Sequence, residues 1–176
     1  MSIQHDPQLR APQQSGVAAC SSGACCPLAS RKTWLLWALL IAFLAYTQWP
    51  MLKGMYYKTT GAKAPISDVA WRSDYDSALA EAGKSGKPVL IDFSAAWCPP
   101  CQVMKHEVWP DQRVGKAIAD GFVPLLVDVD ADSAGLARRF NVSSIPSIVV
   151  VDAEGRVLKQ GSFMSTSQVL EFLRKA

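Results

Sequence analysis

The chain has 176 residues, of which 49% are hydrophobic, and its formal net charge is only +3. This length allows one ordinary domain with additional segments, and the weak charge without a dense Lys/Arg stripe excludes nucleic acid as an expected partner. Of the five cysteines, three lie in the first 30 residues and two near residue 100, which is not the spread of a disulfide-stapled small domain.

The first 30 residues are rich in Gln, Ser, Pro, Ala and Gly and show no apolar periodicity. This composition predicts a disordered tail over residues 1–30. Its three cysteines are Cys20, Cys25 and Cys26. We interpret them as inert reduced thiols, with metal binding or pairing with a redox partner as alternatives.

An uncharged run from Thr33 to Leu52 follows Arg31 and Lys32. Twenty helical residues span ~30 Å, about the thickness of a membrane's hydrocarbon core. The sequence therefore predicts an uncleaved transmembrane signal anchor over residues 31–52, ended by Pro50 on the far side. A cleaved signal peptide is the alternative, but a long polar tail precedes the run and no small-x-small cleavage site follows it.

The basic residues do not decide which way this helix crosses the membrane. Three lie before it and three soon after it, namely Arg10, Arg31 and Lys32 against Lys53, Lys58 and Lys63. The positive-inside rule therefore gives a tie. Residues 53–68, which are polar and contain Gly and Pro, are expected to form a linker.

Residues 69–176 alternate between helix and strand patterns. Strands are expected near 89–93, 122–129, 147–151 and 156–160, and helices near 73–83, 98–108, 111–119, 133–140 and 165–176. Ser73 followed by Asp76 resembles a capping box for the first of these helices. Helices between buried strands indicate an α/β sandwich with a mixed central β-sheet flanked by helices.

Trp97-Cys98-Pro99-Pro100-Cys101 stands where a buried strand gives way to a helix. A thiolate at a helix N-terminus is stabilised by free N–H groups and the positive dipole end. Cys101 lies one turn beyond Cys98, so Cys98 can attack a partner's disulfide and Cys101 can resolve the mixed disulfide. Since neither proline has an N–H, we expect Cys101 and Gln102 to supply the donors.

Two other interpretations of the cysteine pair are weaker. A zinc half-site needs two more ligands, and this domain offers only His106, five residues beyond Cys101 on the same helix. A purely structural disulfide would close a very small loop and stabilise little. The sequence implies no metal and no cofactor.

Two segments resemble the thioredoxin superfamily. They are residues 89–101, which contain the cysteine pair, and residues 141–147, which contain Pro146. Residues 107–111 are more similar to the C-terminal domain of the DsbD family of bacterial transmembrane disulfide reductases. The resemblance covers residues 69–176 and implies a thioredoxin-like sandwich preceded by one transmembrane helix.

The resemblance also implies roles for individual residues. Cys98 would be the exposed nucleophile, Cys101 the buried resolving thiol, and Asp92 the buried acid that handles the proton of Cys101. A carboxyl inside an apolar strand should independently have a raised pKa, which suits this role.

On the substrate side, the resemblance makes Pro146 a cis-proline facing the redox pair. Ile145 before it would contribute backbone contacts to bound substrate, and Trp97 would flank the site. Two departures from thioredoxins affect the redox properties: Leu126 stands where many of them have a lysine near the buried acid, and the cysteines enclose Pro-Pro instead of Gly-Pro.

The remaining candidates have plainer interpretations. Trp71, Trp109 and Phe163 are interpreted as core or rim aromatics. His106 is interpreted as a solvated helix residue.

The sequence thus predicts a membrane-anchored enzyme that reduces or exchanges protein disulfides through Cys98 and Cys101. Its expected partners are protein disulfide substrates, a membrane electron-donor protein, and membrane lipid through the anchor. Resemblance to anchored periplasmic relatives breaks the charge tie and places the domain on the periplasmic side of a bacterial inner membrane. The alternatives are a non-enzymatic membrane-tethered adaptor or chaperone and an oxidase that donates disulfides.

Overall fold

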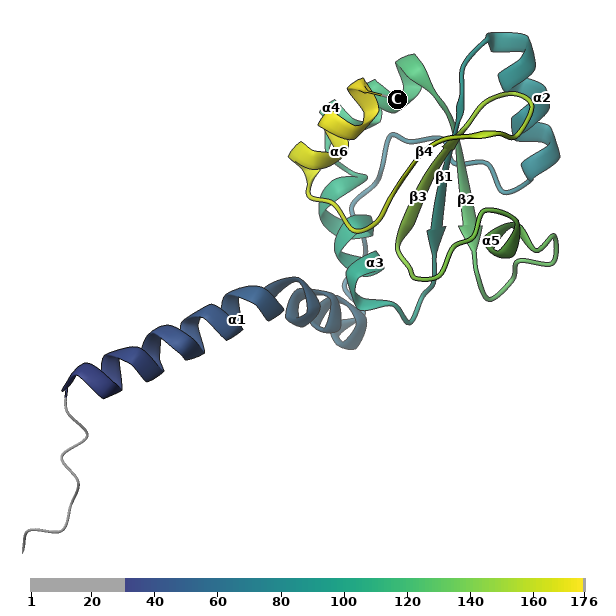
Figure 1. Ribbon diagram of the computed structural model, residues 1–176. Coiled ribbons are helices and arrows are strands. Elements are labelled where there is room, and N and C mark those ends of the chain that lie inside the picture. The colour runs from purple at the N-terminus through teal and green to yellow at the C-terminus, as the bar shows by residue number, and fades with distance from the viewer. Residues whose placement is uncertain (1–30, 176) are drawn as a thin grey trace, which may run out of the picture. The chain divides into compact units, whose positions relative to one another are not determined.

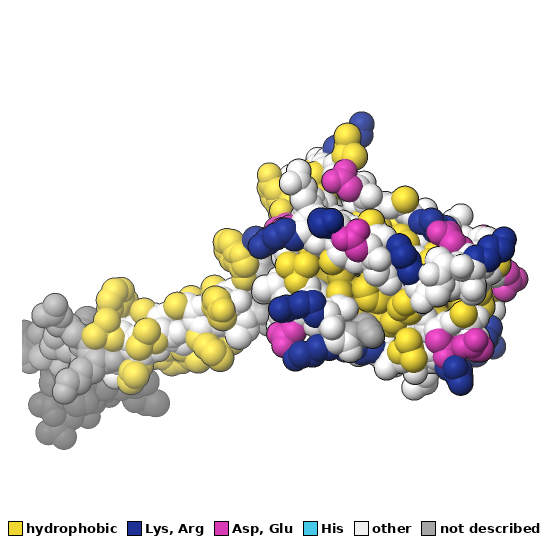
Figure 2. Space-filling view, turned by 90° about the horizontal axis from the view of Figure 1, so that it is seen from above, with side chains coloured by type: hydrophobic (Ala, Val, Ile, Leu, Met, Phe, Trp, Pro, Cys, Tyr) yellow, Lys and Arg dark blue, Asp and Glu magenta, His cyan; other side chains and the backbone are white. Residues whose placement is uncertain are grey.

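A computed structural model describes residues 31–175, and it divides the chain into two compact units, Met1–Leu40 and Ile41–Ala176. The expected disordered tail and its three cysteines lie outside the described residues. Within them, one helix is long and apolar enough to cross a membrane, over Thr33–Thr60. Its large hydrophobic side chains are exposed and form much of the yellow surface along the helix in Figure 2.

This helix, α1, runs from Arg31 to Thr60 and is longer than expected. Pro50 lies inside the helix and does not end it, and residues 53–60 are helical although the sequence suggested a linker. A proline removes one backbone hydrogen bond and strains the turn before it. Met51, Leu52 and Lys53 directly after it are favourable helix formers, and side-chain contacts described below support the helix beyond this point.

The sheet is mixed, as predicted. Its strands are β1 Val89–Ser94, β2 Val123–Asp128, β3 Ser147–Val151 and β4 Val157–Gly161. They are arranged in the order β2-β1-β3-β4, as can be followed in Figure 1. β1 is parallel to β2 and antiparallel to β3, and β4 is antiparallel to β3.

The helices of the domain differ from the prediction mainly at their ends. They are α2 Tyr75–Ser85, α3 Pro99–Val103, the π-helical turn η1 Met104–Val108, α4 Gln112–Gly121, α5 Leu136–Arg139 and α6 Thr166–Arg174. Asp74, and not Ser73, caps α2, because its carboxylate accepts the N–H of Ser77. The helix then continues past Gly83 to Gly86, whose φ of 72° suits a residue without Cβ.

Alternate residues of β1 point to opposite faces of the sheet. Ile91 and Phe93 pack with side chains of α2 and α5, whereas Leu90 packs with side chains of η1, α4 and α6. Figure 1 shows these two groups of helices on opposite sides of the sheet. Asp92 therefore lies on the same face as Leu90, toward the helix that begins at the cysteine pair.

Candidate redox site

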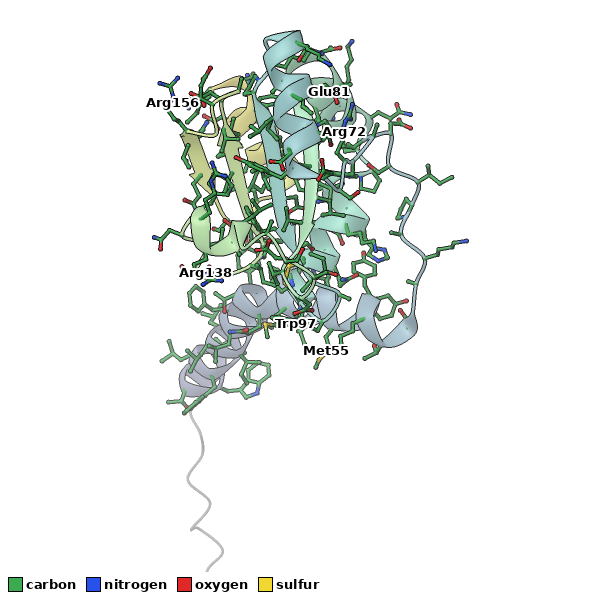
Figure 3. All side chains as sticks on the ribbon, turned by 90° about the vertical axis from the view of Figure 1, so that its right-hand side faces the viewer. Met55, Arg72, Glu81, Trp97, Arg138 and Arg156 are labelled. Carbon is green, nitrogen blue, oxygen red and sulfur yellow. A yellow bond between two sulfur atoms is a disulfide. The ribbon has the colours of Figure 1, made fainter. Side chains whose placement is uncertain are left out.

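Cys98 and Cys101 form a disulfide at the start of α3, with an S–S distance of 2.07 Å and a Cα–Cα distance of 5.3 Å. β1 ends four residues earlier, and Cys98 is the N-cap residue of α3 with Pro99 in the first turn. Proline is tolerated there because the first helical N–H groups have no intrahelical acceptor. Figure 3 draws the bond in yellow, above the label of Trp97.

One of the two donors expected at Cys98 is present. The N–H of Cys101 lies 3.3 Å from the Cys98 sulfur. The N–H of Gln102 instead donates to the carbonyl of Cys98, at 3.1 Å. This expectation was wrong because the fourth residue of a helix already has an acceptor in the cap residue's carbonyl.

The prediction that Cys98 is exposed is also wrong for this conformation, since the residue is 2% exposed, as is Cys101. Both cysteines pack with Ala95, Val129 and Ile145. In addition, α1 lies against the first turn of α3. A Cβ added to the buried Gly54 would be 2.0 Å from the carbonyl oxygen of Pro99, the residue that follows Cys98.

Asp92 is almost completely buried, with 3% of its surface exposed. Burial raises the pKa of its carboxyl to about 7, against a smaller lowering by a hydrogen bond from Trp109. The indole Nε1 of Trp109 donates to Oδ2 at 3.0 Å, and Oδ1 has no partner among residues 31–175. A carboxyl with this pKa can exchange protons near neutral pH.

Asp92 and Cys101 both line a cavity of about 280 Å³. Cys101, Trp109 and Leu126 are among the residues that line it. Leu126 is the register partner of Asp92 in the neighbouring strand, the position where the sequence comparison suggested a missing lysine. Its apolar side chain gives the carboxylate no cation, which is consistent with the raised pKa of Asp92.

A second hollow lies near the disulfide, because Val129 and Ile145, which pack against the cysteines, line it. Trp97, Ser143, Ser144 and Ile145 are among the residues that line this groove of about 350 Å³. The Ile145–Pro146 peptide bond is cis, and Trp97 donates from Nε1 to Asp130 at 2.8 Å. The structure thus brings Trp97 and Ile145 together, and it adds the two serines, which the sequence reasoning did not single out.

Polar contacts between α1 and η1 were not anticipated. The amino group of Lys53 lies 2.9 Å from a carboxylate oxygen of Glu107, and the hydroxyl of Tyr57 donates to the same carboxylate at 2.8 Å. His106, expected to be solvated, stacks on Tyr57 with ring centroids 4.2 Å apart. Burial would raise the pKa of Glu107, but the hydrogen bonds from Lys53 and Tyr57 outweigh it and lower the pKa.

Comparison with known proteins agrees with this geometry. The family that matches residues 70–153 is described as thioredoxin-like. A thiol:disulfide interchange protein DsbD from Ralstonia nicotianae is 35% identical over 112 residues, which are 59% of this chain and 18% of that protein. The DsbD of Yersinia enterocolitica is 32% identical over 151 residues, 80% of this chain and 25% of that protein.

The chain therefore spans a quarter or less of the length of these relatives. A solved thioredoxin from Thermus thermophilus matches over more of its own length. It is 30% identical and superimposes with a TM-score of 0.55, covering 61% of this chain and 86% of that protein. Together with the mixed sheet and the cysteine pair at the start of α3, these matches show that the chain belongs to the thioredoxin-like family.

Proposed function

We propose that this chain is a membrane-anchored thiol–disulfide oxidoreductase that reduces or exchanges disulfides of other proteins. The observation that carries the proposal is the Cys98–Cys101 disulfide at a helix start, with the buried Asp92 behind it. The relatives named as thiol:disulfide interchange proteins support the same class of reaction.

In the reductive direction, the Cys98 thiolate attacks one sulfur of the client disulfide and releases the other client sulfur as a thiolate. Cys101 passes its proton to the Asp92 carboxylate and then attacks the Cys98 sulfur. This forms the Cys98–Cys101 disulfide and releases the second client thiolate. The client gains two electrons and the chain loses two, so a dithiol protein must reduce the pair again.

The client would bind in the groove beside the disulfide. Trp97 and Ile145 line this groove, and the buried Pro146 follows Ile145 directly before β3. An extended peptide there would meet an apolar surface and the backbone beside the cis peptide bond, and addition of an extended peptide along exposed backbone is a common mode of recognition.

The electron donor would be a dithiol protein of the same membrane. Helix α1 has the length and composition of an anchor that holds the domain to lipid, with residues 31–52 in the membrane. Tethering raises the effective concentration of a partner in the same membrane. We place the domain on the periplasmic side of a bacterial inner membrane, as in the anchored relatives that the sequence resembles.

Insulin reduction by the full-length chain in detergent micelles, with dithiothreitol as electron source, tests the enzymatic role. The wild-type chain should accelerate precipitation of the insulin B chain, and the Cys98→Ser variant should not. If the two behaved alike, a non-enzymatic adaptor or chaperone would be the better interpretation.

The direction of the reaction is tested by equilibrating the chain with glutathione buffers. A reductase should have a potential near that of thioredoxin, about −270 mV, whereas a disulfide donor should lie near about −120 mV. A measured potential near about −120 mV would favour the alternative in which the chain is an oxidase.

A further inference from the structure

Trp109 reaches Asp92 because the helix that follows the cysteines changes its winding. Over η1 the backbone follows a π-helix, and the N–H of Trp109 donates to the carbonyl of Met104, five residues back, at 3.0 Å. One extra residue in a turn rotates every following side chain by about 100° relative to a continuous α-helix. The Trp109 side chain is thereby directed into the core, where it is 5% exposed.

The indole is held in place on its other side as well. The rings of Trp71 and Trp109 meet edge to face with centroids 5.3 Å apart. Among residues 31–175, the indole N–H is the one donor to the carboxyl of Asp92, and it occupies Oδ2 alone. The partnerless Oδ1 belongs to a carboxyl that lines the same cavity as Cys101.

We infer that Trp109 is a positioning residue for the resolving step, which holds one oxygen of Asp92 so that the other remains free to take the proton of Cys101. The inference rests on the proposed function, because it assigns a role within the same reaction. The bonds that change are the S–H of Cys101, the mixed disulfide at Cys98, and the new bond between the two cysteines. Asp92 gains the proton, and the client sulfur leaves as a thiolate.

A purely structural Trp109 would also need an acceptor for its buried N–H. The pH profile of the resolving step separates the two roles, since removing the N–H makes the ionised carboxylate, which accepts the proton of Cys101, harder to form. The other titratable groups lining the cavity are Cys101, Lys105 and Asp128, and none of their side chains hydrogen-bonds to Asp92. All three side chains are retained in the Trp109→Phe variant.

The test compares Trp109→Phe with Trp71→Phe in the full-length chain in nanodiscs. Carbon-13 NMR follows the carboxyl of Asp92 in the reduced protein, with Asp92→Asn to assign its signal. We expect Trp109→Phe to raise the pH midpoint of the Asp92 titration by about one unit. Trp71→Phe should leave this midpoint nearly unchanged.

The resolving step itself is measured with Cys98 loaded with thionitrobenzoate, in a chain whose Cys20, Cys25 and Cys26 are replaced by serine. Attack by Cys101 releases the chromophore. For Trp109→Phe we expect release of the chromophore to be about tenfold slower than in the wild-type chain at pH values below the titration midpoint of Asp92. At high pH the rate should return to the wild-type value. In a chain that already carries Asp92→Asn, adding Trp109→Phe should not change the pH profile of release any further.

An unchanged Asp92 midpoint and an unchanged pH profile in Trp109→Phe would overturn the inference and leave Trp109 a core residue. If the phenylalanine variant did not fold, benzothienylalanine at position 109 would keep the ring shape and still remove the N–H. Absence of insulin reduction by the wild-type chain would overturn the proposed function alone, because both measurements of the Asp92–Trp109 pair are intramolecular.

Discussion

At the scale of single residues, Asp92 has a pKa near 7 because burial withdraws its carboxyl from water more than the Trp109 N–H compensates. The same isolation leaves the group able to accept a proton from a neighbouring thiol under neutral conditions. A buried acid of this kind weakens the fold when it ionises. Reactivity and instability at this residue therefore have one cause.

Asp92→Asn should remove a pH dependence of stability. Between the ordinary pKa of 3.8 and about 7, the folded chain keeps a proton on Asp92 that the unfolded chain loses. The free energy of unfolding of the wild-type chain therefore falls as pH rises through this window, by up to about 4 kcal/mol. The variant should be more stable at pH 8 by about 2–4 kcal/mol, measured by urea unfolding of the oxidised chain in detergent. Equal pH dependence in both chains would contradict the assigned burial.

The two cysteines should differ in what their loss does. Cys98→Ser should abolish insulin reduction, because it removes the attacking sulfur. Cys101→Ser should accumulate mixed disulfides with clients, since nothing remains to resolve them. Non-reducing gels of cell extracts would reveal these adducts. Normal turnover by Cys101→Ser would mean that the two roles are assigned the wrong way round.

At the scale of elements, the start of α3 determines which N–H groups can donate to the Cys98 sulfur. An N-cap side chain accepts from the second or third helical N–H, and here the second position is Pro100 and the third is Cys101. The sequence showed only that neither Pro99 nor Pro100 has an N–H to donate. The observed cap shows that the absent donor belongs to Pro100, because the first helical N–H is not one that a cap side chain uses.

Pro100→Ala should therefore stabilise the Cys98 thiolate by restoring a donor. We expect the pH midpoint for iodoacetamide alkylation of Cys98, followed by mass spectrometry, to fall by up to about one unit. Pro99→Ala is the matched control and should change it much less. A larger effect at Pro99 than at Pro100 would show that the stiffness of the proline ring, and not the number of N–H donors, sets the pKa of the Cys98 thiol.

Helix α1 also restricts the site, through the packing of Gly54 on the Pro99 carbonyl. In Gly54→Ala the new methyl group would overlap backbone, so this part of α1 must move away from α3. The alkylation rate of reduced Cys98 should then rise several-fold. Gly83→Ala is the control, because a Cβ there meets no atom within 4 Å. No change in the rate for Gly54→Ala would mean that α1 does not limit access to the sulfur.

At the scale of the whole molecule, the direction of insertion determines which disulfides the domain can reach. Six basic residues are divided equally between the two flanks of the apolar run, so they do not set the orientation. A dithiol that serves cytosolic clients needs no anchor. The proposed tether therefore favours a domain outside the cytoplasm.

We expect the N-terminus inside and the C-terminus outside, with the anchor retained. A C-terminal alkaline phosphatase fusion should be active in bacterial cells, and a C-terminal GFP fusion should be dark. The opposite pattern, a fluorescent GFP fusion with an inactive phosphatase fusion, would reverse the topology. Immunoblotting of the fusions would show a smaller product if the apolar run were cleaved.

Sequence patterns were enough to predict the mixed sheet, the order of strands and helices along the chain, and the position of the cysteine pair. Apolar periodicity, turn residues and the strand-to-helix position of Cys98 and Cys101 are local patterns, so they can be recognised without the fold. The burial of Asp92 was also foreseen, because its neighbours along β1 are apolar on both sides.

The contacts that these groups make are visible only in the folded chain. Trp109 and Asp92 are 17 residues apart, and Lys53 and Glu107 are 54 apart. The first pair meets because η1 gains one residue per turn, and the second because α1 continues past Pro50. Both depend on backbone geometry that residue identity constrains only weakly, since π-turns and prolines inside helices persist where surrounding packing offsets their cost.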